Sequence, residues 1–265
     1  MYYIIQENLF REHHFNTLIE YLKRYKFEYE IIPFRPFTTE LEFKTTRSDV
    51  WPFGSTNLAE VAKKYNWNPG SMYNENHDFL VYGSKYGENM LNHDGKIINF
   101  GDSIPDDYPE IFFARPTKDT KQFTGQVFGK EAWKEWSKEI DDSSLKQTLT
   151  KETQILIAPC KNIQQEIRCW IVDGKPVTIS QYKIGSRVNY LNMDNNQEAM
   201  LFAQSICDIY CPARAFVLDI CLANDEYKVV EINCINCSGF YDGNMSKLIQ
   251  SLENTFSYGN NTILS

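Results

Sequence analysis

The beginning of the chain combines two apolar runs with an amphipathic segment between them. Residues 1–6 (MYYIIQ) are apolar enough for a buried strand, and residues 27–34 (FEYEIIPF) alternate in the way a strand does. Between residues 15 and 22, apolar side chains recur at the three- and four-residue spacing of one helix face. The pattern predicts a strand–helix–strand unit, as in a small Rossmann-like layer.

A second helix and a long irregular stretch follow. A Gly-Ser-Thr-Asn turn leads into an amphipathic segment, with Ser55, Thr56 or Asn57 available as the N-cap. Residues 66–110 are rich in Asn, Gly, Asp and Pro, which favours loops with short strands and a domain boundary near residue 105. We therefore expect two regions, 1–105 and 106–265.

The second region is dominated by strand patterns. Helical patterns interrupt them only around 129–140 and 196–210. The strand-like runs are EIFFARP, ILIAP, EIRCWIV, KPVTISQY, AFVLDICL and KVVEINC. The pattern predicts a mixed fold, α/β at the beginning and α+β in the second region.

Composition narrows the classes of function. The chain has 265 residues with 42% hydrophobic and 14% aromatic residues, as expected of a folded globule. Its net charge of −8 argues against binding nucleic acid by bulk charge. The polar start predicts no secretory signal, and no apolar run is long enough for a membrane span. The seven cysteines are then expected to be reduced thiols in a cytoplasm.

One predicted hairpin carries a cluster of oxygen donors. In AFVLDICLANDEYKVVEIN, a turn centred on Asp225 makes Asp219 and Glu231 direct cross-strand neighbours, with Cβ atoms about 4.5–5.5 Å apart. Asn233 lies two residues further along the same face. Opposed carboxylates repel, and an all-oxygen donor set suits Mg²⁺ bound with substrate phosphates. A solvated sheet face is the alternative.

A second predicted hairpin gathers charges of both signs. The Asp173–Gly174 turn predicts a two-residue loop that pairs Arg168 with Ile179. Glu166, Arg168 and Lys183 then share one face, where fixed cations suit polyphosphate oxygens. The alternative is a surface ion pair between Glu166 and Lys183.

A basic, glycine-containing loop follows the strand FFARP. The strand delivers Arg115, and the loop carries Lys118, Lys121, Thr124 and Gly125. Such a loop can close over phosphates, although the Walker pattern is absent. A solvated surface loop is the alternative.

In this order, the motifs resemble those of the ATP-grasp enzymes. The corresponding segments are FFARP, KDTKQFTGQ, QILIAPC, EIRCWIVDGK, FVLDI and VVEINCINCSGFYD, within residues 105–250. The sequence is most similar to a compact branch of amide-forming ligases, common in phage-like and bacterial sequences, with Arg115–Pro116 where the family usually has Lys-Pro. Residues 1–105 resemble the preATP-grasp region. The resemblance implies an ATP-grasp fold with a Rossmann-like preATP-grasp part.

The resemblance also implies ATP and Mg²⁺ as cofactors and assigns residues to them. Metal ligands would be Asp219, Glu231 and Asn233, and the residues acting on the phosphates would be Arg115, Arg168 and Lys183. The complete implied nucleotide site is Arg115, Lys118, Lys121, Ile157, Ala158, Cys160, Glu166, Arg168 and Lys183. The implied reaction is ATP-dependent joining of a carboxylate to an amine through an acyl phosphate, with release of ADP and phosphate.

The substrates are less defined than the nucleotide site. Candidates for contacting them are Arg187, Arg214, Ser238, Gly239 and Tyr241, which lie near the motifs. The carboxylate and amine could belong to small molecules, peptides or a protein acceptor, and a homodimer is left open.

Three other functions remain as alternatives. The pairs Cys207/Cys211 and Cys234/Cys237 suggest a zinc site, although a cysteine in an apolar helix is usually a small hydrophobe. An ATP-binding regulator and a small-molecule kinase would share the same metal site. His13–His14 begins a predicted amphipathic helix, where a structural position is expected.

Overall fold

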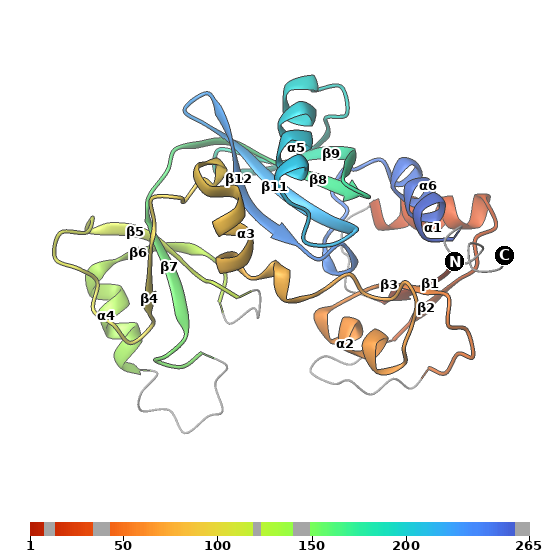
Figure 1. The fold of residues 1–265 in the computed structure, drawn as a ribbon, viewed down its shortest axis with the longest axis horizontal. Coiled ribbons are helices and arrows are strands. Elements are labelled where there is room, and N and C mark those ends of the chain that lie inside the picture. The colour runs from red at the N-terminus through yellow and green to blue at the C-terminus, as the bar shows by residue number, and fades with distance from the viewer. Residues whose placement is uncertain (8–13, 34–42, 119–122, 140–148, 258–265) are drawn as a thin grey trace.

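A computed structural model describes residues 1–7, 14–33, 43–118, 123–139 and 149–257 of the chain. It contains three sheets arranged along the long axis of the molecule (Figure 1). No helix in these ranges is both long and apolar enough to cross a membrane.

The N-terminal layer is a parallel three-stranded sheet in the order β2-β1-β3. Its elements are β1 (Tyr2–Gln6), α1 (His14–Arg24), β2 (Tyr29–Ile32), β3 (Val50–Phe53) and α2 (Thr56–Lys64). The expected strand–helix–strand unit is confirmed. Ser55 is the N-cap of α2, but its side chain makes no capping hydrogen bond.

The C-terminal helix α6 (Met245–Phe256) packs against this N-terminal layer (Figure 1). Leu248 and Leu252 of α6 share a buried core with Tyr3 and Leu22. The Tyr3 hydroxyl donates to Glu253 at 2.7 Å, which ties β1 to α6. The two ends of the described chain therefore stabilise each other.

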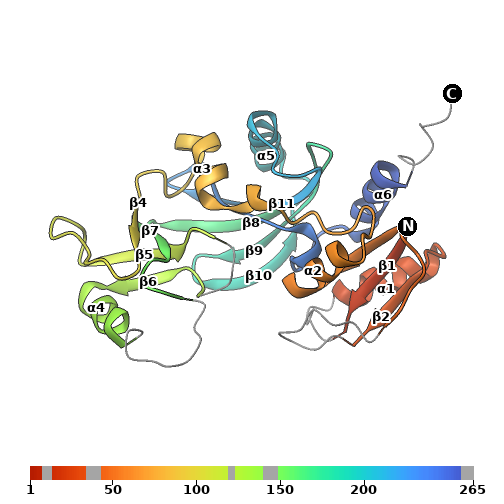
Figure 2. The ribbon, with the colours of Figure 1, turned by 60° about the horizontal axis from the view of Figure 1, so that its bottom comes forward.

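A four-stranded antiparallel sheet lies at the other end of the molecule (Figure 2). Its order is β4-β7-β5-β6, built from β4 (Lys96–Asn99), β5 (Ile111–Pro116), β6 (Gln126–Gly129) and β7 (Gln154–Pro159), with α4 (Lys130–Glu139) following β6. Trp133 of α4 packs with Phe100 and Phe112 in the aromatic core of this sheet. Strand β4 precedes residue 105 yet pairs with β7, which follows it; the division at 105 stays a prediction.

The central sheet is antiparallel and has the order β10-β9-β8-β11-β12. Its strands are β8 (Ile163–Val172), β9 (Lys175–Ile184), β10 (Arg187–Asn192), β11 (Ala215–Ala223) and β12 (Glu226–Asn233). One face packs on α3 (Phe79–Tyr86) and α5 (Gln197–Ile209) through apolar side chains such as Ile167, Phe216 and Leu218. The other face carries Trp170 and Val217 in the core shared with the N-terminal layer.

The sequence patterns missed several elements. Residues 66–110 contain helix α3 and the 3-10 helices Glu75–His77 and Gly87–Asn89, so the expectation of loops with short strands alone was wrong there. Strand β10, helix α6 and the 3-10 helix Ile235–Cys237 were not expected either. Helix α3 is short, and its apolar residues are consecutive rather than periodic, which hides it from a pattern analysis.

Both hairpin turns are left-handed, as expected, but bulges change the pairing behind them. Asp173 and Gly174 have φ of 51° and 72°, which fits a type I′ turn. A bulge between Trp170 and Ile171 shifts β9, so Arg168 lies opposite Ser180. The predicted pairing of Arg168 with Ile179 was wrong, because a turn sets the register only up to the first bulge.

Candidate active site

Strand β11 places one carboxylate between two functional strands. Asp219 pairs with Glu231 on β12 and with Arg168 on β8. The turn at Asn224–Asp225 alone would offset the partners by one residue, and a bulge between Asp219 and Ile220 restores the pairing of Asp219 with Glu231. The predicted cross-strand pair is confirmed.

Arg168 and Asp219 form a buried bidentate ion pair. The Arg168 Nε lies 2.9 Å from Asp219 Oδ1, and Nη2 lies 2.8 Å from Oδ2. The two residues are 7% and 1% exposed, so water screens this pair little. Burial raises the pKa of the Asp219 carboxyl, and Arg168 opposes that rise. The geometry therefore holds Asp219 rigidly beneath the neighbouring groups.

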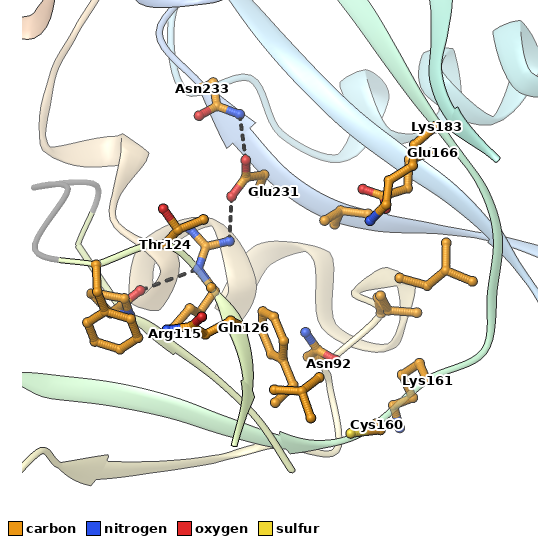
Figure 3. A pocket seen from close by; sticks show the side chains of 18 of the residues that line it. Asn92, Arg115, Thr124, Gln126, Cys160, Lys161, Glu166, Lys183, Glu231 and Asn233 are labelled. Atoms are coloured by element: carbon orange, nitrogen blue, oxygen red, sulfur yellow. Dashed lines mark hydrogen bonds and ion pairs between the residues drawn. The ribbon is translucent and has the colours of Figure 1, made fainter. Parts of the chain in front are cut away.

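Glu231 is held from two sides. Arg115, on β5 of the four-stranded sheet, donates from Nη1 to Glu231 Oε2 at 2.7 Å (Figure 3). Asn233 Nδ2 donates to Glu231 Oε1 at 2.9 Å and to Asp219 Oδ2 at 3.1 Å. Burial alone would raise the pKa of Glu231; Arg115, Asn233 and Arg168 hold it below its usual value.

Glu166 forms the third carboxylate group of the site. It accepts from the Tyr182 hydroxyl at 2.7 Å and from Lys183 Nζ at 2.7 Å. Burial first, and then the nearby carboxylates, raise the pKa of Tyr182, so its hydroxyl stays protonated as a donor. With the two arginine pairs, the site holds three carboxylates, each paired with one cation.

A cavity of about 650 Å³ lies between the central and the four-stranded sheets. This volume is within the usual range of small-ligand pockets. Of the residues singled out from the sequence, the lining includes Arg115, Lys118, Thr124, Gly125, Cys160, Glu166, Lys183, Glu231 and Asn233. Figure 3 shows charged side chains from both sheets around this space.

The lining also contains residues that the sequence analysis did not identify: Asn92, Gln126, Lys161 and Tyr182. Lys161 forms an ion pair with Asp94, which joins the end of β7 to the loop before β4. Tyr182 precedes a predicted site residue, but regular alternation places neighbours on opposite faces. The bulge between Glu166 and Ile167 lets both Tyr182 and Lys183 reach Glu166.

Other predicted nucleotide residues lie outside the lining. Arg168 and Asp219 lie beneath Glu231 and Asn233 and are not among the lining residues. Ile157 pairs with β4 and β5, and Ala158 pairs with β5 inside the same sheet. Lys121 lies outside the described residues.

The candidate substrate residues separate into two groups. The Gly239 carbonyl accepts from Arg168 Nη1 at 3.3 Å, and the Tyr241 ring centroid lies 4.6 Å from the Arg168 Cζ. Ser238 lies just before them, and its hydroxyl donates to the Cys234 carbonyl at 2.8 Å. Arg187 is exposed at the start of β10.

Arg214 is not brought to the cavity. It forms an ion pair with Asp173 at 3.2 Å, at the β8–β9 turn, and its Cζ lies 4.9 Å from the Phe256 ring centroid. These contacts place it beside the C-terminal helix, away from the residues that line the cavity.

A family model described as an ATP-grasp domain, family 3 of its clade, matches residues 61–252. The match covers more than half of the chain. The chain belongs to this ATP-grasp family. No curated protein sequence matches it.

Solved ATP-grasp structures share its fold at low identity. The D-alanine–D-alanine ligase from Bacillus anthracis is 14% identical with a TM-score of 0.59, and 96% of each chain is covered. The D-cycloserine synthetase DcsG is 11% identical with a TM-score of 0.57, covering 96% of this chain and 98% of that one. The ATP-grasp ligase PsnB in complex with a minimal precursor is 9% identical with a TM-score of 0.53, covering 96% and 98%.

The ATP-grasp fold, the use of ATP and Mg²⁺ and the assignment to the ligases are therefore confirmed at the level of the family. The donor set fits Mg²⁺, because the oxygens of Glu231 and Asn233 border the cavity and Asn233 links them to Asp219. In the described ranges, no group of three His, Cys, Asp or Glu residues could hold a metal, which disfavours the zinc alternative. Cys211 instead donates from Sγ to the Cys207 carbonyl. His13 lies outside the described residues.

Proposed function

We propose that this ATP-grasp protein is a carboxylate–amine ligase that forms an amide or peptide bond through an acyl phosphate. The observation that carries the proposal is the connected set Arg115–Glu231–Asn233–Asp219–Arg168, which links the two sheets at one side of the cavity. It places fixed charges of both signs at a site large enough for a nucleotide.

The proposed reaction has two steps. A carboxylate oxygen of the first substrate attacks the γ-phosphorus of ATP, and the bond to the β–γ bridging oxygen breaks with its electron pair going to ADP. The amine nitrogen of the second substrate then attacks the acyl carbon. Inorganic phosphate leaves, and the nitrogen loses a proton.

The chain's own cations are suited to the phosphates. Arg115 lies at the cavity wall, where its guanidinium can turn from Glu231 to a phosphate oxygen, and Lys183 lies on the opposite sheet. Arg168 keeps its charge beneath them, fixed by Asp219. Glu231, Asn233 and Asp219 would hold Mg²⁺. When bound, the metal supplies neutralisation of the phosphate charge during transfer.

The remaining walls divide into a nucleotide end and a closing segment. The end of β7, at Cys160 and Lys161, and Glu166 on β8 border the cavity where a base and ribose can be held. Lys118, Thr124 and Gly125 border it from the segment around β6. An acyl phosphate hydrolyses in open water, so this segment is proposed to cover the site.

The class of substrate is left at a carboxylate and an amine. Gly239 and Tyr241, in the loop after β12, contact Arg168 and are proposed to face the substrate carboxylate. One structural neighbour, PsnB, is solved with a precursor peptide, so peptides belong among the substrates to be tested.

Product analysis tests the proposal. The protein is incubated with Mg²⁺, ATP, pooled amino acids, amines and peptides, and ADP, AMP, phosphate and pyrophosphate are measured. Glu231→Gln removes a proposed metal ligand, while Glu226→Gln on the same strand, whose side chain is 70% exposed, is the matched control. We expect ADP and phosphate formation that depends on a pool component and on Glu231 but not on Glu226.

Other outcomes identify other functions. AMP and pyrophosphate would mean adenylation and contradict the acyl phosphate. A stable phosphorylated product would indicate a small-molecule kinase. ATP binding without turnover in any pool would favour a nucleotide-binding regulator.

A further inference from the structure

Strand β10 leaves the edge of the central sheet open beside the candidate active site. In the part of the chain that the structure describes, β10 pairs only with β9. Val188 is 70% exposed, Leu191 52% and Tyr190 39%. Exposed apolar edge strands are usually protected, because their free backbone groups can pair with another chain.

A bulge in β10 turns Tyr190 toward the site. Val188 pairs with Lys183 and Leu191 with Gln181, so Asn189 and Tyr190 together lie opposite Tyr182. Bulges of this kind re-aim a side chain, often next to an active site. The edge strand therefore has a side chain directed along the sheet.

The tyrosines connect this edge to the cavity. Tyr190 stacks on Tyr241 with ring centroids 5.1 Å apart, and Tyr241 stacks on Tyr182 at 5.0 Å. Tyr182 lines the cavity, and Arg168 lies over Tyr241. A ligand bound along β10 would thus contact side chains that reach the proposed phosphoryl-transfer site.

The loop at the end of β10 fixes where an added strand would stop. Asp242 accepts from the Asn192 N–H at 2.9 Å, and the Asp242 N–H donates to Ser180 Oγ at 3.1 Å. Tyr241 has a φ of 43°, a left-handed conformation that a bulky residue adopts only when its surroundings hold it. This pinned loop directs the end of a docked chain toward Gly239 and Arg168.

We propose that β10 binds the acceptor as an extended peptide that adds a strand to the sheet and presents an acidic side chain to the site. The inference rests on the proposed ligase function, which begins at a carboxylate. Arg187, exposed at the open end of β10, suits an acidic peptide. A second copy of the chain fits less well, because this six-residue strand presents far less than the roughly 1,000 Å² of a stable interface.

Selection and binding measurements test this inference. Random decapeptides, each containing Glu, are displayed and selected on the full chain with Mg²⁺ and a non-hydrolysable ATP analogue. The enriched peptide is resynthesised with a fluorescent label, with and without N-methyl groups at alternate residues. Val188→Glu disturbs the edge, and Leu201→Glu on α5 is the matched control, because both residues are 70% exposed.

We expect N-methylation and Val188→Glu each to weaken peptide binding about tenfold or more, since both remove strand addition. Leu201→Glu should leave peptide affinity unchanged, and all variants should bind the ATP analogue equally. No enriched peptide, a peptide insensitive to Val188→Glu, or a dimer that Val188→Glu dissociates would overturn the inference. If pooled free amino acids alone still yield ADP and an amide, the ligase function stands without a peptide acceptor. If no carboxylate substrate yields ADP, the ligase function itself is wrong.

Discussion

Arg115 and Glu231 come from different sheets and meet at the cavity, with Arg115 Nη1 2.7 Å from Glu231 Oε2. The arginine therefore occupies an oxygen that the family's magnesium site would use. Metal and guanidinium cannot both neutralise this oxygen fully. Binding of Mg²⁺ should release Arg115 toward the phosphates, which couples metal binding to nucleotide binding.

Arg115→Gln tests this exchange. Without the guanidinium, the nucleotide-free protein should bind Mn²⁺, a spin-active substitute for Mg²⁺, about tenfold more tightly, because a competing cation is gone. Its affinity for ATP should fall. Electron paramagnetic resonance measures free Mn²⁺, and calorimetry measures ATP binding.

Two variants make the result specific to this position. Arg115→Lys keeps a cation and should bind Mn²⁺ nearly as the parent does. Arg47→Gln breaks an ion pair in the N-terminal layer, with Asp49, and should change neither affinity. Mn²⁺ affinity that stays the same in Arg115→Gln would show that the arginine does not compete with the metal.

The sequence was sufficient to predict this site where local signals agreed. Asp219, Glu231 and Asn233 were placed correctly because a short turn joins their strands and the sheet fixes which side chains share a face. The opposing contribution of Arg115 could not be derived from alternation, because β5 lies in another sheet.

Two kinds of feature were hidden from the sequence. Bulges shifted the β8–β9 pairing and brought Tyr182 to Glu166, and nothing in the residue pattern marks their position. Helix α6 was missed although its apolar face is regular, because attention to the metal strand and its following loop left that segment unassigned. Its packing on β1 depends on contacts distant in sequence.

The buried pair Arg168–Asp219 should matter for stability as well as function. Arg168→Ala leaves an uncompensated carboxylate that is 1% exposed, which should lower the free energy of unfolding by about 3–5 kcal/mol. Arg47→Ala breaks an exposed pair and should cost about 1 kcal/mol or less. Urea denaturation of both variants gives the comparison. Equal losses would contradict a special role for burial.

His77 should make the fold sensitive to mild acid. It is 2% exposed, its Nε2 has no hydrogen-bond partner among the described residues, and burial lowers its pKa from 6.5 to about 4. The unfolded chain therefore takes up this proton first. Stability is fully present above pH 6.5 and falls as the pH decreases toward about 4, by about 3 kcal/mol in total.

Urea denaturation at several pH values measures this loss. His77→Gln should lack that part of the pH dependence, whereas replacing the exposed His93 with Gln should retain it. The prediction is wrong if His77→Gln and the parent lose stability in parallel between pH 6.5 and 4.

Gly125 should be required for nucleotide binding because of the space beside Arg115. A Cβ at this position would lie 2.7 Å from Phe113 Cζ and 3.2 Å from Arg115 Cβ, so the segment would have to move away from β5. At Gly129, four residues on, the nearest atom is the Glu110 carbonyl oxygen at 4.0 Å. Gly125→Ala should therefore weaken ATP binding by about tenfold, while Gly129→Ala should not, as measured by calorimetry. Equal ATP affinities in the two variants would mean that this segment does not contact the bound nucleotide closely.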